Sequence, residues 1–154
     1  MPRGRYERCI MTLHRAFFTT IFVGLFANTM PAVADDDTVA ITSMLTQSAH
    51  YWNHGNLDAF MRGYENASTT VYVSSKRVIH GYANIRAHYA EHYGIGTLPT
   101  LSISDIAVRP LGDRYAVVVA RWHLAMHDGT HPTGIFTLVL HRTSGWHIIT
   151  DHSP

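Results

Sequence analysis

The sequence predicts an α+β fold, in which helices in the first half pack against a mostly antiparallel sheet formed by the second half. Apolar residues recur at helical spacing between residues 38 and 93. After residue 100 they alternate with period two and are rich in β-branched side chains. Short turns rich in Gly and Asp separate these strand-like runs, which indicates consecutive hairpins. Helices followed by such strands are typical of an α+β domain.

The first 34 residues are typical of a secretory signal peptide. Four arginines precede the apolar run AFFTTIFVGLFA, and a small-x-small cleavage site ends at Ala34. The run is shorter than the roughly 20 apolar residues of a membrane span, and an uncleaved anchor is the alternative. We expect residues 1–34 to be removed and residues 35–154 to form one periplasmic or secreted domain, free of the membrane after cleavage. Translation starts at Met1 or Met11.

The composition of the expected mature domain excludes several classes of function. Removing four Arg and one Glu from the 12 basic and 11 acidic residues leaves 8 and 10, a net charge of −2 with His neutral. This balance does not favour a nucleic-acid partner or an anionic membrane surface. The only cysteine, Cys9, lies in the signal peptide, so the domain has no disulfide and no thiol nucleophile. No cofactor is expected, because no Gly-rich phosphate loop occurs.

Periodicity and capping residues place the individual elements. A first helix starts after an N-cap at Asp37 or Thr38 and has an apolar stripe that ends at Trp52. Asn56 caps a short second helix whose apolar residues reach Tyr64. The run TTVYVSSKRVIHG predicts two short strands, which precede a third helix. The third helix and the four long strands are Tyr82–Tyr93, Leu101–Arg109, Arg114–His127, Thr133–Arg142 and Trp146–His152.

Three segments together resemble a known family. They are HYWNHGNLDAFMRGY, VIHGYANIRAHYAEHYG and the C-terminal ARWHL…GIFTLVLHR…GWHIITDHS. Their order and spacing are similar to the SnoaL-like branch of the nuclear-transport-factor-2-like superfamily. The resemblance implies a cone-shaped α+β fold, with a curved sheet wrapped around three helices and a pocket inside. It also implies that dimers through the sheet are common. Enzymes and non-catalytic association domains share this fold, so the activity stays open.

The turns suggest a register for the sheet. If Asp128–Gly129 and Ser144–Gly145 are two-residue hairpin loops, Trp122 lies opposite Ile135. A slip of one residue would exchange the two faces. The face expected to meet the helices consists of Val118, Ala120, Trp122, Leu124, Ile135, Thr137, Val139, Trp146, Ile148, Thr150 and His152.

This register separates the neighbours Asp151 and His152, because successive strand residues point to opposite faces. His152 is then expected in the pocket. Asp151 is expected on the convex face, where Arg121 is a candidate partner. The convex face mixes apolar residues with Arg and His, which suits a homodimer interface.

His152 is the candidate for proton transfer, because the usual pKa of histidine is suited to acid–base catalysis. The alternative is a histidine that only closes the fold. Tyrosine hydroxyls in the pocket could stabilise an oxyanion, or they could belong to an aromatic core. The expected ligand-binding residues are Trp52, Tyr64, Tyr89, Tyr93, Trp122, Thr137 and His152.

Two carboxylates and two histidine pairs are further candidates for the site. Asp58 suits the first turn of the second helix, and Asp105 could point inward, but both fit structural roles. His88 with His92, and His123 with His127, have spacings that a metal could use. Neither pair encloses a carboxylate as a third ligand, so no metal site is expected.

The sequence therefore predicts an exported protein that binds a small hydrophobic ligand in an apolar pocket. Acid–base catalysis of the isomerase, cyclase or dehydratase type is compatible with this pocket. The alternative is a non-catalytic dimerisation or accessory module of the cell envelope. A cavity filled by tryptophans would favour the module, whereas an open cavity with a polar edge would favour ligand binding.

Overall fold

The computed structural model describes residues 33–93 and 98–154, and the chain divides after Met30 into two units. The predicted signal peptide lies almost wholly outside the described residues. The helices are α1 (Val33–Asn53), α2 (Leu57–Met61) and α3 (Tyr82–Tyr93). The strands are β1 (Val71–Val73), β2 (Val78–His80), β3 (Thr100–Leu111), β4 (Tyr115–Ala125), β5 (Thr133–Arg142) and β6 (Trp146–His152).

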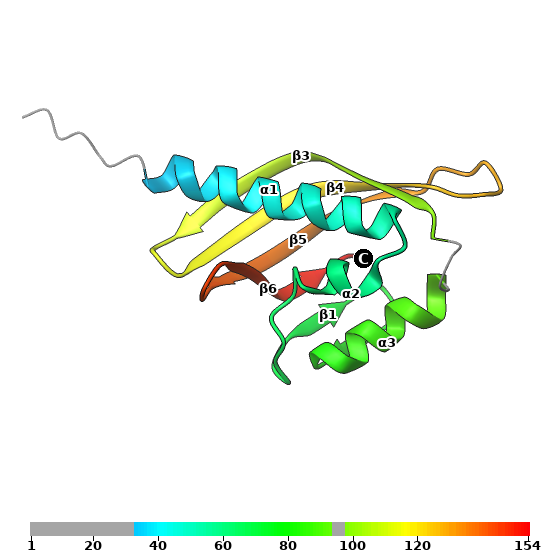
Figure 1. Cartoon of the computed structure of the whole chain (residues 1–154), viewed down its shortest axis with the longest axis horizontal. Helices are drawn as coiled ribbons and strands as arrows, with labels where there is room; N and C mark the ends of the chain where they lie inside the picture. Colours follow the sequence, from blue (N-terminus) through cyan, green and yellow to red (C-terminus); the bar gives the residue numbers. More distant parts are fainter. Residues whose placement is uncertain (1–32, 94–97) are drawn as a thin grey trace, which may run out of the picture. The chain divides into compact units, whose positions relative to one another are not determined.

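The strands form one six-stranded mixed sheet in the order β2-β1-β6-β5-β4-β3 (Figure 1). Strands β3 to β6 form an antiparallel meander, and β1 joins its edge by pairing parallel to β6. The α+β class and the mostly antiparallel sheet are therefore confirmed. None of the described helices is long and apolar enough to cross a membrane.

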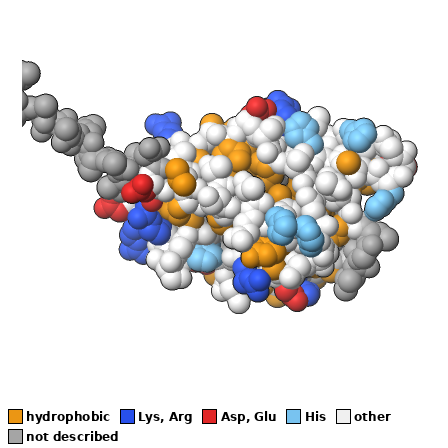
Figure 2. Space-filling view, turned by 45° about the horizontal axis from the view of Figure 1, so that its top comes forward, with side chains coloured by type: hydrophobic (Ala, Val, Ile, Leu, Met, Phe, Trp, Pro, Cys, Tyr) orange, Lys and Arg blue, Asp and Glu red, His pale blue; other side chains and the backbone are white. Residues whose placement is uncertain are grey.

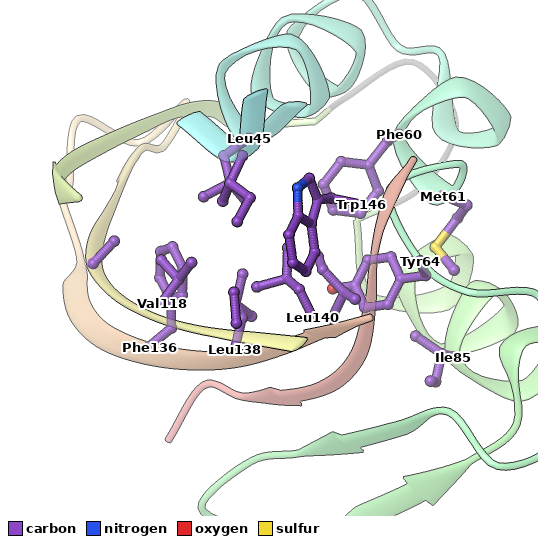
Figure 3. Close-up of a cluster of buried hydrophobic side chains, with 14 of the residues drawn as sticks. Leu45, Phe60, Met61, Tyr64, Ile85, Val118, Phe136, Leu138, Leu140 and Trp146 are labelled. Carbon is purple, nitrogen blue, oxygen red and sulfur yellow. The ribbon is translucent and has the colours of Figure 1, made fainter. Parts of the chain in front are cut away.

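The long helix α1 lies along one face of the sheet and packs against β3 (Figure 1). Its apolar stripe points at the sheet, because Ile41, Leu45 and Trp52 are all at most 3% exposed. Side chains from β4 and β5 meet this stripe, as the close-up of the core shows for Val118 and Leu138 (Figure 3). The core lies between this helix and the inner face of the sheet.

The start of α1 differs from the prediction. The helix begins at Val33, so neither Asp37 nor Thr38 is its N-cap. Asp37 is instead 7% exposed and forms an ion pair with Arg142 of β5. The Arg142 guanidinium also lies 4.6 Å from the centre of the Trp146 ring. A buried carboxylate needs such a partner, and this contact ties the first turns of α1 to the last hairpin.

The predicted register between β4 and β5 was wrong by one residue. Trp122 pairs with Gly134 instead of Ile135. The turn has three residues, since Met126 N–H donates to Thr130 O and Gly129 adopts a φ of 80°. A three-residue hairpin with glycine in the left-handed region is a standard alternative to the two-residue loop. The extra residue turns every side chain of β5 to the face opposite to the one predicted.

Strand β6 contains a second irregularity, a shift of register opposite Val139 and Leu140. Val139 pairs with Thr150, as predicted, but Leu140 pairs with Ile148, so Ile149 is the extra residue of a bulge. The bulge lets Ile148 and Asp151, three residues apart, face the same side.

The two irregularities together correct the predicted faces. Val118, Ala120, Trp122, Leu124, Trp146 and Ile148 face the helices as predicted. Phe136, Leu138, Leu140 and Asp151 join them, against the prediction. The expected inward positions that instead face outward are Ile135, Thr137, Val139, Thr150 and His152.

Trp122 and Gly134 form a close contact across β4 and β5. A β-carbon built on Gly134 would lie only 2.6 Å from Cζ2 of Trp122 and 2.9 Å from its Nε1. The indole ring therefore occupies the space that any other residue at position 134 would fill. Glycine inside a strand often marks such a close approach.

We predict that Gly134→Ala lowers the free energy of unfolding by about 1–3 kcal/mol, because the added methyl group overpacks the site beneath Trp122. Urea denaturation followed by circular dichroism measures the change. Gly145→Ala is the matched control, since its nearest foreign atom would be 3.9 Å away, and it should cost less than about 0.5 kcal/mol. Equal losses in the two variants would contradict the contact.

Candidate functional site

A cavity of about 160 Å³ lies between the inner face of the sheet and the helices, and part of its boundary opens to solvent. Most of its wall is apolar or aromatic, and both α1 and the strands β3 to β5 contribute. The lining residues are Leu45, Ser48, Trp52, Phe60, Tyr64, Tyr72, Tyr89, Leu101, Ile103, Trp122, Leu124, Phe136, Leu138, Ile148 and Ser153. A concave, mostly apolar site with a few polar groups is typical of small-molecule binding.

A hydrogen-bond cluster around Asp151 forms a polar end of this cavity. Asp151 is 4% exposed and lies behind the hydroxyls that reach the cavity wall. Tyr64 donates to Asp151 Oδ2 at 2.5 Å, and the Tyr89 hydroxyl lies 3.5 Å from the same oxygen. The two tyrosine oxygens are 2.9 Å apart. Ser153 Oγ donates to Asp151 Oδ1 at 2.6 Å.

Local backbone pairing positions Tyr64 in this cluster. The segment after α2 pairs with β6, because Glu65 N–H donates to Ile148 O and Ile148 N–H donates to Gly63 O. The Glu65 carboxylate, 2.8 Å from His141 Nδ1, anchors the same segment to β5. Since neighbours in an extended segment point in opposite directions, Tyr64 points inward while Glu65 points outward.

Tyr89 comes to the cluster from α3, where it packs among other rings. Its ring centre lies 5.2 Å from that of Phe60 and 5.7 Å from that of Trp52, both in edge-to-face geometry. Such aromatic contacts hold a ring in one orientation. The Tyr89 hydroxyl is therefore directed at Asp151 and Tyr64 by packing as well as by hydrogen bonds.

Burial dominates the electrostatics of the cluster. It raises the pKa of the Asp151 carboxyl above its usual value, although hydrogen bonds from Ser153 and Tyr64 act in the opposite direction. Burial, followed by the negative charge of Asp151, raises the pKa of Tyr64 well above its usual value. Tyr64 is thus held as a neutral hydroxyl, and Asp151 is the group of this cluster whose proton is most readily exchanged.

Comparison with known proteins identifies the family. No protein-family model matches the chain, and no curated protein sequence matches it. An NTF2-like protein of unknown function from Shewanella oneidensis MR-1 is 32% identical, with a TM-score of 0.71. The match covers 75% of this chain and 97% of that protein. The chain belongs to the NTF2-like superfamily.

Other NTF2-like folds match this chain with lower identity. One is a protein from Novosphingobium aromaticivorans that is provisionally named an aromatic ring hydroxylase. It is 20% identical over 77% of this chain and 88% of its own, with a TM-score of 0.65. A second protein from that organism, provisionally named a scytalone dehydratase, is 13% identical over 79% and 85%, also with a TM-score of 0.65. At these identities the matches support the fold alone.

The NTF2-like structure brings together four of the residues expected in the pocket. Trp52, Tyr64, Tyr89 and Trp122 all line the cavity. The indole N–H of Trp52 is engaged elsewhere, because it donates to Pro99 O at 2.9 Å. Their role in binding a ligand stays a prediction.

The other expected site residues are placed differently. His152 is exposed and Thr137 faces outward beside it, so the expectation that they line the pocket was wrong. The cause is the three-residue turn between β4 and β5, which turned this part of the sheet over. The side chain of Tyr93 lies outside the described residues. Asp151 takes the inward position that had been expected for His152.

The two candidate carboxylates, Asp58 and Asp105, lie on the surface of the NTF2-like domain. Asp58 pairs with Arg86 at 2.7 Å. Asp105 has a φ of 54° at the bulge of β3 and pairs with Arg121 at 3.3 Å. Arg121 is therefore the partner of Asp105, and the suggested contact between Arg121 and Asp151 does not form.

The described residues contain no group of three or more His, Cys, Asp or Glu side chains that could hold a metal ion. Figure 2 shows histidine side chains spread over one face of the molecule instead of gathered at one point.

Sequence reasoning missed Asp151 and Ser153 as parts of the site. A signal was present, because HDG between the strands also fits a three-residue turn with glycine last. With a three-residue turn, each side chain of β5 is expected on the face opposite to the one that a two-residue turn predicts. The bulge at Ile149 carries no comparable signal, since the run WHIITDH alternates in no regular way.

We predict that the stability difference between Asp151→Asn and the natural chain depends on pH. Because the pKa of Asp151 is raised in the folded state, the folded chain keeps this proton to a higher pH than the unfolded chain. Stability from this group is present at low pH and is lost as pH rises from about 4 through the folded-state pKa. The variant has an amide in place of this carboxyl, so it does not lose stability in this way as the pH rises.

Urea denaturation of both chains from about pH 4 to pH 8 tests this prediction. The free energy of unfolding of the variant should rise relative to that of the natural chain as the pH increases. Asp113→Asn, in the exposed turn before β4, controls for the general effect of removing one negative charge. A difference between Asp151→Asn and the natural chain that stays constant over the range would refute the raised pKa.

Proposed function

We propose that this protein is an exported member of the SnoaL-like branch that binds a small, largely apolar organic ligand and performs acid–base chemistry on it. One observation carries the proposal. The buried carboxylate of Asp151 is hydrogen-bonded in a cluster with two tyrosine hydroxyls at the polar end of an apolar cavity. Residues with perturbed pKa values in such a cavity are candidates for a functional site.

The size of the cavity favours a ligand with a single ring. An engineered apolar cavity of about 150 Å³ binds benzene, and this cavity has a volume of about 160 Å³. Aromatic walls from Trp52, Phe60 and Trp122 would contact the faces and edges of such a ring. The hydroxyl of Tyr89 would meet an oxygen on it.

The proposed chemistry is proton movement next to that oxygen. Isomerisation, dehydration and cyclisation all require a proton to leave or join a carbon near an oxygen-bearing carbon. When Asp151 carries a proton, Tyr64 can donate to Tyr89, and the Tyr89 hydroxyl would then donate to the oxygen and polarise it. Asp151, which does not line the cavity, would hold the proton through the tyrosines. It replaces His152 in this role, because His152 is exposed on the outer face.

The alternative, a non-catalytic module of the cell envelope, is favoured less. A cavity filled by its tryptophans would have supported it. Trp52 and Trp122 form only parts of the wall, and Trp146 packs beneath Arg142. The cavity has open space and a polar end, which supports ligand binding.

We predict that single-ring organic compounds raise the Tm of the protein and that Leu124→Trp abolishes the rise. Leu124 lines the cavity, so the larger ring would fill the space that the ligand needs. A ligand at a hundred times its Kd stabilises the folded chain by about 2.7 kcal/mol, a change that thermal-shift measurements detect.

His123→Trp is the matched control, because this neighbour points to the other face of β4 and should preserve the ligand-induced rise. Native mass spectrometry of protein purified from its source complements the screen. The proposal would be contradicted if no small hydrophobic compound changes the Tm and no ligand co-purifies with the protein.

We also propose that the outer face of the sheet joins two copies of the chain. Tyr115, Val119 and Ile135 lie along this face and are 43%, 43% and 51% exposed, and exposed large apolar side chains can mark an interaction surface. Burying them against a second copy would remove this apolar area from water.

We predict that Ile135→Lys converts a dimer to a monomer, because an unpaired ammonium would have to be buried at the interface. Size-exclusion chromatography with light scattering measures the mass. Val39→Lys, on the exposed side of α1 (61% exposed), is the control and should leave the dimer intact. A natural chain that is monomeric at micromolar concentration would contradict this interface.

A further inference from the structure

The directions of the hydroxyl protons around Asp151 determine what the polar end of the cavity can offer a ligand. An ionised carboxylate only accepts hydrogen bonds, and each hydroxyl carries a single proton. Tyr64 and Ser153 lie 2.5 and 2.6 Å from the two oxygens of Asp151. These separations are typical of hydroxyl groups that donate to a charged carboxylate. When Asp151 is ionised, both protons are therefore committed to it.

The proton of Tyr89 is directed into the cluster as well. Its oxygen lies 2.9 Å from that of Tyr64 and 3.5 Å from Asp151 Oδ2. Because the Tyr64 proton already points at Asp151, Tyr89 must be the donor in the contact between the two tyrosines. All three hydroxyl protons are then used in hydrogen bonds within the cluster. Tyr89 and Ser153 line the cavity, and with their protons used in this way their hydroxyl oxygens can act toward a ligand only as acceptors.

We infer that this site selects ligands that donate a hydrogen bond, namely single-ring alcohols or phenols, over carbonyl compounds and ethers of the same size. The inference rests on the proposed function and specifies the substrate class of the same cavity. A ligand hydroxyl would donate to Tyr89 or Ser153. A carbonyl oxygen would meet lone pairs. Binding it would require Tyr89 to give up the hydrogen bond it donates to Tyr64, or Ser153 to give up the hydrogen bond it donates to Asp151.

Protonation of Asp151 reverses this preference. One added proton lets Asp151 donate to Tyr64, Tyr64 donate to Tyr89, and Tyr89 donate into the cavity. No bond other than O–H bonds changes in this rearrangement.

The titratable groups around Asp151 come from four parts of the fold. They are Tyr64 after α2, His88 and Tyr89 on α3, Tyr72 on β1, and His152 on β6 itself. A positive charge on His152 would favour the ionised form of Asp151.

Three ligands of equal heavy-atom count test the inference. Cyclohexanol donates and accepts, cyclohexanone only accepts, and methylcyclohexane does neither. Their Kd values are measured by NMR titration of the full chain at about pH 8 and about pH 5, on either side of the usual histidine pKa. We expect cyclohexanol to bind about tenfold more tightly than cyclohexanone at the higher pH. This preference should decrease at the lower pH.

Asp151→Asn is the decisive variant, because the amide brings its own protons and at least one hydroxyl can then donate into the cavity. The tenfold preference for cyclohexanol should disappear. Tyr89→Phe keeps the ring and removes the hydroxyl nearest the ligand, so it should also reduce the preference for cyclohexanol. It replaces Asp151→Asn as the test variant if the asparagine variant does not fold. Asp113→Asn, in the exposed turn before β4, should retain the full preference.

The outcomes separate the two proposals. Cyclohexanone binding as tightly as cyclohexanol to the natural chain, or a preference that survives in Asp151→Asn and Tyr89→Phe, would overturn the proton directions while the ligand-binding function stands. Failure of all three compounds to bind would overturn this inference and also count against the proposed function.

Discussion

The carboxylate of Asp151 is the constraint on which the arrangement of the site depends. A charged or polar group in this position, 4% exposed, is tolerated only if its hydrogen bonds are satisfied. Three parts of the chain supply these bonds, namely the segment after α2, helix α3 and the end of β6. The same contacts that compensate the buried charge also join these segments. Any rearrangement of the polar end of the cavity would therefore expose the Asp151 carboxylate to solvent or leave it without hydrogen-bond partners.

Two departures from regular sheet geometry place that carboxylate. The turn between β4 and β5 has three residues, and Gly129 provides the positive φ it requires. The bulge at Ile149 then lets Ile148 and Asp151 face the same side. In an uninterrupted strand these two residues would point to opposite faces. Bulges often redirect a side chain next to a functional site, and here the redirected side chain is the only buried carboxylate at the cavity among the described residues.

The chemistry of the cavity follows from the contrast between its wall and its polar end. The wall offers apolar and aromatic surface, which would contact a bound ring without selecting a reaction. In the proposed function the cluster of Asp151, Tyr64 and Tyr89 would supply the selectivity, because its hydroxyl groups would bind ligand groups that donate a hydrogen bond in preference to groups that only accept one. Membership in the NTF2-like superfamily adds the scaffold but does not choose among the activities that this scaffold supports. The proposed function therefore depends on three side chains and their protons.

The sequence by itself determined the fold class, the order of the elements and four aromatic residues of the cavity wall. Helical spacing from Ile41 to Trp52 and period-two strands after residue 100 are local signals, because they follow from the geometry of a single element. The aromatic residues Trp52, Tyr64, Tyr89 and Trp122 were expected in a pocket because they lie on apolar faces of their elements and because the family resemblance implies a pocket.

Only the tertiary structure decided which of Asp151 and His152 faces the cavity. That choice depends on the parity of pairing across two hairpins, and one extra residue in the turn between β4 and β5 reverses it. Both turn lengths are compatible with the same sequence, and the hydrogen-bond partners of Asp151 lie far away along the chain. Tyr64 is 87 residues from Asp151 and Tyr89 is 62 residues away. No local pattern encodes contacts over such separations.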